Sequence, residues 1–203
     1  MTTSRYRTLA TPAQGLYKEK GSRFISYAFP VRSTEVITQH LAALRSEHHA
    51  ARHCCYAYTL GFDAEVFRAN DDGEPSGTAG KPILNALQSE GLTYVLLVVV
   101  RYFGGIKLGV SGLIEAYRTA SLDALSRAEL VWREVMVRLR LEFSYAEAHA
   151  VYAALKRSGG EILSETWEEQ CRCVMLAALE KARAPQLLTA LASLPCCELV
   201  DEY

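Results

Sequence analysis

The sequence has 203 residues, of which 50% are hydrophobic and 22% are charged, and its formal net charge is −1. This composition excludes a disordered chain, and the length allows one large domain or two small ones. The longest apolar run, about Tyr94–Val100, is far shorter than the ~20 residues of a membrane helix, and the first residues lack the apolar stretch of a signal peptide. We therefore expect a cytoplasmic protein with no membrane contact.

The first part of the chain combines strand patterns with amphipathic helix patterns. Ser33 or Thr34 is placed to cap a helix, and Pro82 and Gly91 are placed to begin and end another. Thr93–Arg101 is apolar almost throughout, which is typical of a strand buried on both faces. The expected strands are 4–10, 15–20, 22–31, 54–60, 65–69 and 93–101, and the expected helices are 34–48, 82–91 and 113–130.

After Arg133 the order of elements changes to strand, helix, strand, strand, helix, strand. This order is the ferredoxin-like βαββαβ unit. We therefore predict two α+β domains, residues 1–133 and 134–203, each a sheet with helices on one face. The expected strands of the second domain are 134–143, 161–167, 170–179 and 196–202, and its expected helices are 145–157 and 184–194.

The two predicted domains differ modestly in charge. Residues 1–133 carry 15 Lys and Arg against 12 Asp and Glu, a net of +3, and residues 134–203 carry 7 against 11, a net of −4; the sums are the 22 and 23 of the whole chain. The difference favours the first domain as the binder of a negatively charged partner.

A glycine-rich loop between the apolar strand and the long helix is the first candidate site. Glycines let the backbone approach a ligand closely, and the first amides of a helix are unpaired at the positive end of its dipole. The loop matches neither the P-loop nor the dinucleotide fingerprint, and a tight turn that packs strand against helix is the alternative. The candidate anion-binding or nucleic-acid-binding residues are Lys81, Arg101, Gly104, Gly105, Lys107, Gly109, Gly112, Arg118 and His53.

The acidic loop before Lys81 is the second candidate site. Asp71, Asp72 and Glu74 are suitable ligands for a hard cation such as Mg²⁺. A structural role is favoured, in which an Asp-Gly turn precedes a helix capped by Thr78. Pairing of Glu74 with a nearby Arg or Lys is a third option.

Metal and thiol chemistry have less support. His49 and His53 are four residues apart, but a strand is expected to begin at Cys54, so we expect no metal site; surface imidazoles near the basic loop gain positive charge below pH ~6.5. The six cysteines are expected to be reduced thiols packed as small hydrophobes. Adjacent cysteines in a strand point to opposite faces, whereas Cys171 and Cys173 are expected to share one.

Several motifs in a fixed order resemble the YigZ/IMPACT family across about residues 15–125. They are His53–Tyr58, Asp71–Pro82, Val99–Gly109, and Gly112-Leu113 with Ala116-Tyr117. The resemblance implies a first domain similar to the second domain of a small-subunit ribosomal protein, a fold shared with domain IV of elongation factor G and with small-molecule kinases. It implies a second domain similar to a ferredoxin-like domain of elongation factor G.

Eukaryotic members of that family are translational regulators that bind a partner of a starvation-sensing kinase. They carry a different extra domain, so the resemblance does not transfer this partner to the present chain. It also transfers no catalytic residue, and likeness of fold alone does not establish function.

We therefore expect a regulator of translation, not an enzyme, that binds RNA or ribosome-associated proteins through phosphate groups, without a cofactor. The main alternative is an enzyme acting on a phosphorylated small molecule or nucleotide, in which Asp72 and Glu74 hold Mg²⁺ or act as a base. A hydrolase or peptidase that uses the His and Cys residues near His53 is the weaker alternative. The sequence indicates no oligomeric state.

Overall fold

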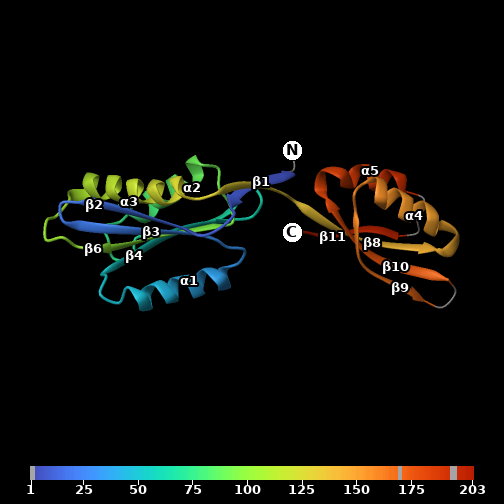
Figure 1. The fold of residues 1–203 in the computed structure, drawn as a ribbon, viewed down its shortest axis with the longest axis horizontal. Coiled ribbons are helices and arrows are strands. Elements are labelled where there is room, and N and C mark those ends of the chain that lie inside the picture. Colours follow the sequence, from blue (N-terminus) through green and yellow to red (C-terminus); the bar gives the residue numbers. More distant parts are fainter. Residues whose placement is uncertain (1–2, 169–170, 193–195) are drawn as a thin grey trace. The chain divides into compact units, whose positions relative to one another are not determined.

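The computed structural model describes residues 3–168, 171–192 and 196–203, and Figure 1 shows their fold. The chain divides into two compact units: one is Tyr6–Arg133, and the other joins the residues up to Arg5 with Glu134–Tyr203. The start of the chain thus groups with the second unit, which the sequence pattern did not indicate. The amide of Val135 donates to the carbonyl of Ser4 at 2.8 Å.

The first unit is built around a five-stranded sheet with antiparallel neighbours, in the order β2-β3-β6-β4-β5. The apolar strand of the sequence is β6, at the centre of this order. Every residue from Val95 to Arg101 is buried, so the prediction of burial on both faces is confirmed. The strands are β2 (Ala13–Glu19), β3 (Ser22–Pro30), β4 (His53–Leu60), β5 (Val66–Asn70) and β6 (Val95–Tyr102).

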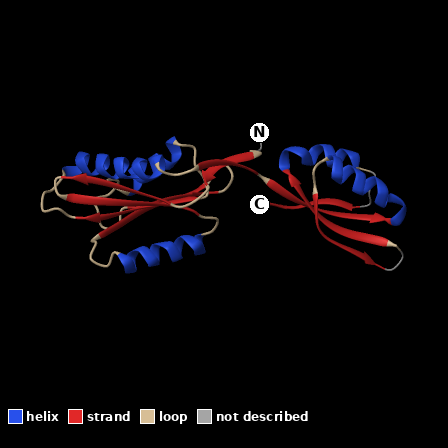
Figure 2. Ribbon diagram, viewed as in Figure 1, coloured by secondary structure: helices blue, strands red, loops and turns tan. Residues whose placement is uncertain are grey.

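Helices cover both faces of this sheet, so the prediction of helices on one face is wrong for the first unit. Figures 1 and 2 show α2 (Gly80–Ser89) and α3 (Gly109–Ser126) on one face and α1 (Thr34–Glu47) on the other. Alternate residues of β6 supply the two cores. Leu97 and Val99 pack with α2 and α3, and Leu96, Val98 and Val100 pack with α1.

The long helix of the first unit is displaced from its predicted bounds. It begins at Gly109 instead of about Leu113, and it ends at Ser126. The following residues form β7 (Leu130–Glu134), which pairs with β1 (Arg5–Leu9) in a separate two-stranded sheet. The sequence Leu-Val-Trp suits an extended strand, because β-branched and aromatic residues favour strands.

The second unit has the predicted order of elements and a four-stranded antiparallel sheet, β11-β8-β10-β9. Its two helices pack on one face, over a core that the inward-facing residues of the sheet complete. Ser144 and Glu147 form a capping box at the start of α4. The elements are β8 (Met136–Ser144), α4 (Tyr145–Arg157), β9 (Glu161–Glu168), β10 (Arg172–Glu180), a 3₁₀ turn (Lys181–Arg183), α5 (Ala184–Ala190) and β11 (Cys196–Glu202).

The cysteines test the prediction of packed, reduced thiols. Cys54, Cys55 and Cys173 are buried and form no disulfide. Cys54 and Cys55 belong to the cores on opposite faces of the first sheet, as predicted. The prediction for Cys171 is wrong: it lies outside β10 with a positive φ of 58° and is exposed, so it does not share the buried face of Cys173. The side chain of Cys196 lies outside the described part of the chain.

Among the helices that the structure describes, we find none with the length and apolar character needed to cross a bilayer.

Candidate functional site

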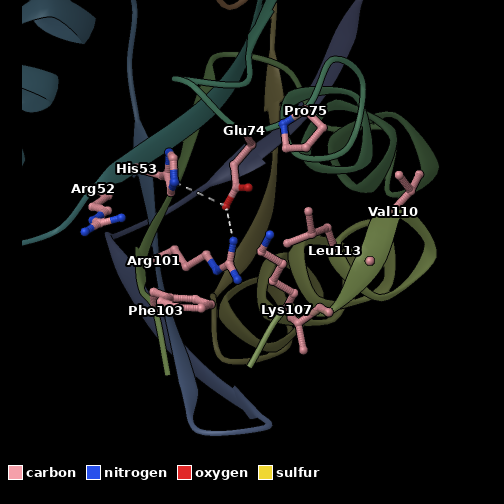
Figure 3. A pocket seen from close by; sticks show the side chains of 11 residues that line it. Arg52, His53, Glu74, Pro75, Arg101, Phe103, Lys107, Val110 and Leu113 are labelled. Atoms are coloured by element: carbon pink, nitrogen blue, oxygen red, sulfur yellow. Dashed lines mark hydrogen bonds and ion pairs between the residues drawn. The ribbon is translucent and has the colours of Figure 1, made fainter. Parts of the chain in front are cut away.

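A pocket of about 460 Å³ lies where β6 ends and α3 begins, within the first unit. It brings together four of the predicted anion-site residues: His53, Arg101, Lys107 and Gly109. Figure 3 shows His53, Glu74 and Arg101 close together, with Lys107, Val110 and Leu113 facing them. The full lining is Arg52, His53, Glu74, Pro75, Arg101, Phe103, Lys107, Leu108, Gly109, Val110 and Leu113.

The glycines of the loop serve different purposes. Gly104 is pressed against another turn, since a Cβ placed on it would lie 1.9 Å from the carbonyl carbon of Gly21. Its amide is already used, donating to Ser22 Oγ at 3.1 Å. Gly109 instead has a φ of 75° and open space where a Cβ would be. The tight-turn interpretation therefore holds for Gly104, while Gly109 lies at the pocket.

The first turn of α3 is open to a ligand in a way that the starts of α1 and α4 are not. Its N-cap residue, Leu108, provides no side-chain hydrogen bond, whereas Ser33 accepts an amide at the start of α1 and Glu147 accepts the Ser144 amide at the start of α4. The first amides of a helix have no partner within it and carry the positive end of its dipole. Gly109 and Val110 line the pocket, so this positive end lies at its wall.

Arg101 and Glu74 form a buried ion pair in the wall of the pocket. Arg101 Nη1 donates to Glu74 Oε1 at 2.6 Å, and the two residues are only 6% and 8% exposed. The hydroxyl of Tyr117 donates to the same oxygen at 2.8 Å. Pairing of Glu74 with an arginine, one of the three predicted options, is therefore what the structure contains. Arg101 is neutralised by Glu74 and is not a free cation for a phosphate.

The ring of His53 is fixed by the acidic loop. Its Nδ1 lies 2.9 Å from the backbone oxygen of Asp72, and because that oxygen only accepts, we assign the proton to Nδ1. Nε2 lies 3.9 Å from Glu74 Oε1. His49 is exposed beyond the end of α1. Within the described residues no three His, Cys, Asp or Glu side chains are grouped as metal ligands.

Asp71 builds the acidic loop. Its carboxylate accepts the amides of Gly77, Ala79 and Gly80 at 2.9, 3.0 and 2.8 Å, and it thereby caps the start of α2. Burial raises the pKa of Asp71, but these three amides outweigh burial and leave it below its ordinary value. The predicted cap, Thr78, is wrong, because its hydroxyl donates to the carbonyl of Pro75 instead.

Asp72 is also occupied by protein donors. It accepts the amide of Cys54 at 2.7 Å through one oxygen and Arg45 at 2.7 Å through the other. The carboxylates of Asp71 and Asp72 thus hold backbone segments together. This arrangement matches the favoured structural role of the loop and gives no support to a Mg²⁺ site.

Five of the nine predicted residues are not among those that line the pocket, namely Lys81, Gly104, Gly105, Gly112 and Arg118, and one charged lining residue is absent from the prediction. Lys81 is an exposed residue in the first turn of α2, and Arg118 lies 3.8 Å from Glu115 on the surface of α3. Arg52 lines the pocket but was not proposed. Its signal was its place beside His53, whose strand pairs with β6 at Arg101.

The thiols near the pocket are poor nucleophiles. Burial raises the pKa of Cys54 to about 11, and it raises the pKa of Cys55 further. Cys55 Sγ lies 3.0 Å from the carbonyl of Asp71 and 3.3 Å from the Tyr117 hydroxyl. Both groups are thiols at neutral pH, which disfavours a hydrolase that uses a cysteine here.

Comparison with known proteins agrees with the sequence motifs. Residues 20–125 match the model of the Impact N-terminal domain, a range that contains every residue of the pocket. The chain belongs to the IMPACT family. It is 32% identical to the IMPACT family member YigZ of Escherichia coli (strain K12), over 90% of each chain.

A second curated relative and a solved structure also match most of the chain. The IMPACT family member YvyE of Bacillus subtilis (strain 168) is 37% identical over 68% of this chain and 63% of its own length. A crystal structure titled as that of a hypothetical protein matches with a TM-score of 0.73 and 31% identity, and covers 98% of this chain and 97% of its own. The IMPACT chain described here thus resembles its relatives in both units.

Proposed function

We propose that this IMPACT family protein is a regulator of translation that binds single-stranded RNA, without catalysing a reaction, through the pocket at the start of α3. One observation carries the proposal: Arg52, Lys107 and the first turn of α3 line the same pocket. Among the described residues, neither Arg52 nor Lys107 has a hydrogen-bond or ion-pair partner. Free cations beside helix amides are a common site for a phosphate.

The charge of the pocket favours an anion. Arg52, Arg101 and Lys107 contribute three positive charges and Glu74 one negative charge, a net of +2 with His53 neutral. Because Glu74 is paired with Arg101, the two remaining cations are available to phosphates. Each phosphate neutralised by such a cation releases counterions, so the binding should weaken as salt is added.

An exposed aromatic ring beside these cations favours a nucleic acid over a simple anion. Phe103 lines the pocket and is 47% exposed. Bases of single-stranded RNA stack on such rings with little dependence on sequence. The Arg101 guanidinium lies 5.6 Å from the ring centre and supports the ring from one side.

The second unit has the strand order of a widespread fold. Its βαββαβ order and its sheet order β11-β8-β10-β9 are those of the ferredoxin-like fold, which we assign to it. We infer that the first unit resembles domain IV of elongation factor G and that the chain works in the cytoplasm on ribosome-associated RNA. The face of the second sheet opposite its helices carries paired charges, including Arg138–Asp201 and Arg172–Glu142, so we assign RNA binding to the first unit.

The test is fluorescence anisotropy of labelled single-stranded RNA with the full chain at low salt. Lys107→Gln and Arg52→Gln should each weaken binding, and each should reduce the slope of log affinity against log salt by about 0.7. Lys81→Gln and Arg118→Gln are matched controls, since they remove the same charge outside the pocket. No binding at low salt, or equal losses in all four variants, would overturn the proposal.

A second candidate is an enzyme acting on a phosphorylated small molecule. The pocket volume, about 460 Å³, is within the ~300–1,000 Å³ of small-molecule sites, and the free Nε2 of His53 could accept a proton. This candidate predicts a rise in melting temperature with a ligand from a panel of phosphorylated metabolites. The RNA proposal predicts no such rise with metabolites that lack a nucleoside.

A further inference from the structure

Glu74 presents an unused acceptor to a pocket otherwise rich in donors. Its Oε1 atom receives Arg101 Nη1 and the Tyr117 hydroxyl. Among the described residues no group donates to Oε2, and this atom is not one of the fully buried atoms without a partner. Oε2 therefore keeps some exposed surface, and Glu74 is one of the residues that line the pocket. Figure 3 shows this second oxygen turned away from His53 and Arg101.

The same wall holds a second unsatisfied group. Arg101 Nε is fully buried and has no acceptor among the residues the structure describes. A buried donor without a partner is uncommon in native proteins. The surface of the wall therefore offers an acceptor at Glu74 and the Nε2 atom of His53, while Arg101 Nε lies beneath this surface.

A phosphate alone does not satisfy this wall. The carboxylate of Glu74 and a phosphate are both acceptors of like charge, so the group that meets Oε2 must carry an O–H or N–H. Lys107, Arg52 and the α3 amides require an anion on the facing side. The complementary ligand therefore has a hydrogen-bond donor a short distance from a phosphate.

Resting on the proposed function, we infer that the pocket recognises the ribose of a ribonucleotide unit, with Glu74 Oε2 accepting a hydrogen bond from the 2′-hydroxyl and Lys107 contacting the phosphate. Carboxylates make this contact with the ribose in dinucleotide-binding proteins. The 2′-hydroxyl is both donor and acceptor, and it is the group by which a protein separates RNA from DNA. The site then selects RNA without reading its sequence.

The experiment changes the ligand and leaves the protein intact. Three labelled oligonucleotides of one sequence are compared: RNA, DNA with uracil in place of thymine, and 2′-O-methyl RNA, which keeps the oxygen but cannot donate. RNA should bind about tenfold or more tightly than either of the others, because a hydrogen bond to a charged group is lost in both. Equal affinities for all three would overturn the inference. Glu74 would then either accept a hydrogen bond from the amino group of a base or serve only the stability of the fold.

Variants separate this inference from the proposed function. Lys107→Gln should weaken the binding of RNA and of DNA by the same factor. Glu74→Gln should instead make the affinities for RNA and DNA nearly equal. If Lys107→Gln weakens the binding of both oligonucleotides but the unchanged protein binds RNA and DNA equally, the phosphate site is supported and ribose recognition is rejected. If Lys107→Gln changes neither the RNA affinity nor the DNA affinity, the proposed function itself is rejected.

Competition identifies the source of the ribonucleotide. Displacement of the RNA by ribonucleoside 5′-monophosphates, but not by deoxyribonucleoside 5′-monophosphates, supports ribose recognition and identifies a free nucleotide as a sufficient ligand. Equal displacement by both kinds contradicts it. The ligand comparison does not depend on the folding of Glu74→Gln, whose circular dichroism and melting temperature should be measured alongside.

Discussion

Arg101 Nη1 lies 2.6 Å from Glu74 Oε1, joining the end of β6 to a loop 27 residues earlier in the chain. Both residues are almost fully buried, and the Tyr117 hydroxyl of α3 completes the contact at 2.8 Å. One carboxylate oxygen thus ties together a loop, a strand and a helix. The pocket wall depends on this junction for its shape.

Removing one partner of this pair should destabilise the first unit strongly. Glu74→Ala leaves the Arg101 charge buried and unpaired, and we expect a loss of about 3–5 kcal/mol in the free energy of unfolding. The double replacement Glu74→Leu with Arg101→Met should cost less than the sum of the single changes, because no unpaired charge remains. Urea unfolding followed by circular dichroism measures all variants. A loss below about 1 kcal/mol for Glu74→Ala would show that the pair contributes little.

Gly104 should not tolerate a side chain, while Gly112 should. A Cβ on Gly104 would lie 1.9 Å from the Gly21 carbonyl carbon, so Gly104→Ala forces two backbone segments apart. We expect a loss of about 1–3 kcal/mol or more. Gly112→Ala is the matched control, since its Cβ would meet only Leu108 Cβ at 3.1 Å within a helix that favours alanine. Similar losses in both variants would contradict this account.

The acid sensitivity of the first unit should depend on Asp71. Burial raises the pKa of Asp71, and its three backbone amides lower it further than burial raises it, so the folded pKa lies below the unfolded value of about 3.9. Such a group contributes stability above the unfolded pKa and loses it as pH falls through the folded pKa. Asp71→Asn should lower stability at pH 7 and flatten its decline between about pH 5 and pH 2. An unchanged pH profile in the variant would reject this role.

The thiols should differ widely in reactivity. Burial raises the pKa of Cys54 to about 11 and raises that of Cys55, whereas Cys171 is exposed. Alkylation at pH 7.5, mapped by peptide mass spectrometry, should modify Cys171 in the native protein and should reach Cys54, Cys55 and Cys173 only after unfolding. Native labelling of Cys55 as fast as that of Cys171 would revive the hydrolase alternative.

Local patterns predicted most elements of the fold but not the contacts between distant segments. The capping signal at Ser33 or Thr34 placed α1, and the apolar run placed β6. That run already indicated two covered faces, because a strand with no polar face needs partners on both sides. The expectation of helices on one face is inconsistent with this signal. In the structure, α1 covers the second face and places Ile37 and Leu44 in the second core.

The candidate site was predicted in part, for reasons of geometry. Asp71 reaches the amide of Ala79 eight residues later, a contact that depends on how the whole loop closes and that local capping patterns do not reveal. Arg118 follows Gly109 by nine residues, and at about 100° per residue it lies half a turn away from the pocket side of α3. Nearness in sequence therefore overstated the role of Arg118.

The close approach of Gly104 to Gly21 has a consequence for recognition. Because one end of the glycine loop is fixed to the turn between β2 and β3, that end is already in place before a guest arrives. A preorganised loop loses little conformational entropy when a ligand binds, so a few contacts are enough for useful affinity. Loosening this anchor should therefore slow association and weaken binding even with every cation of the pocket intact.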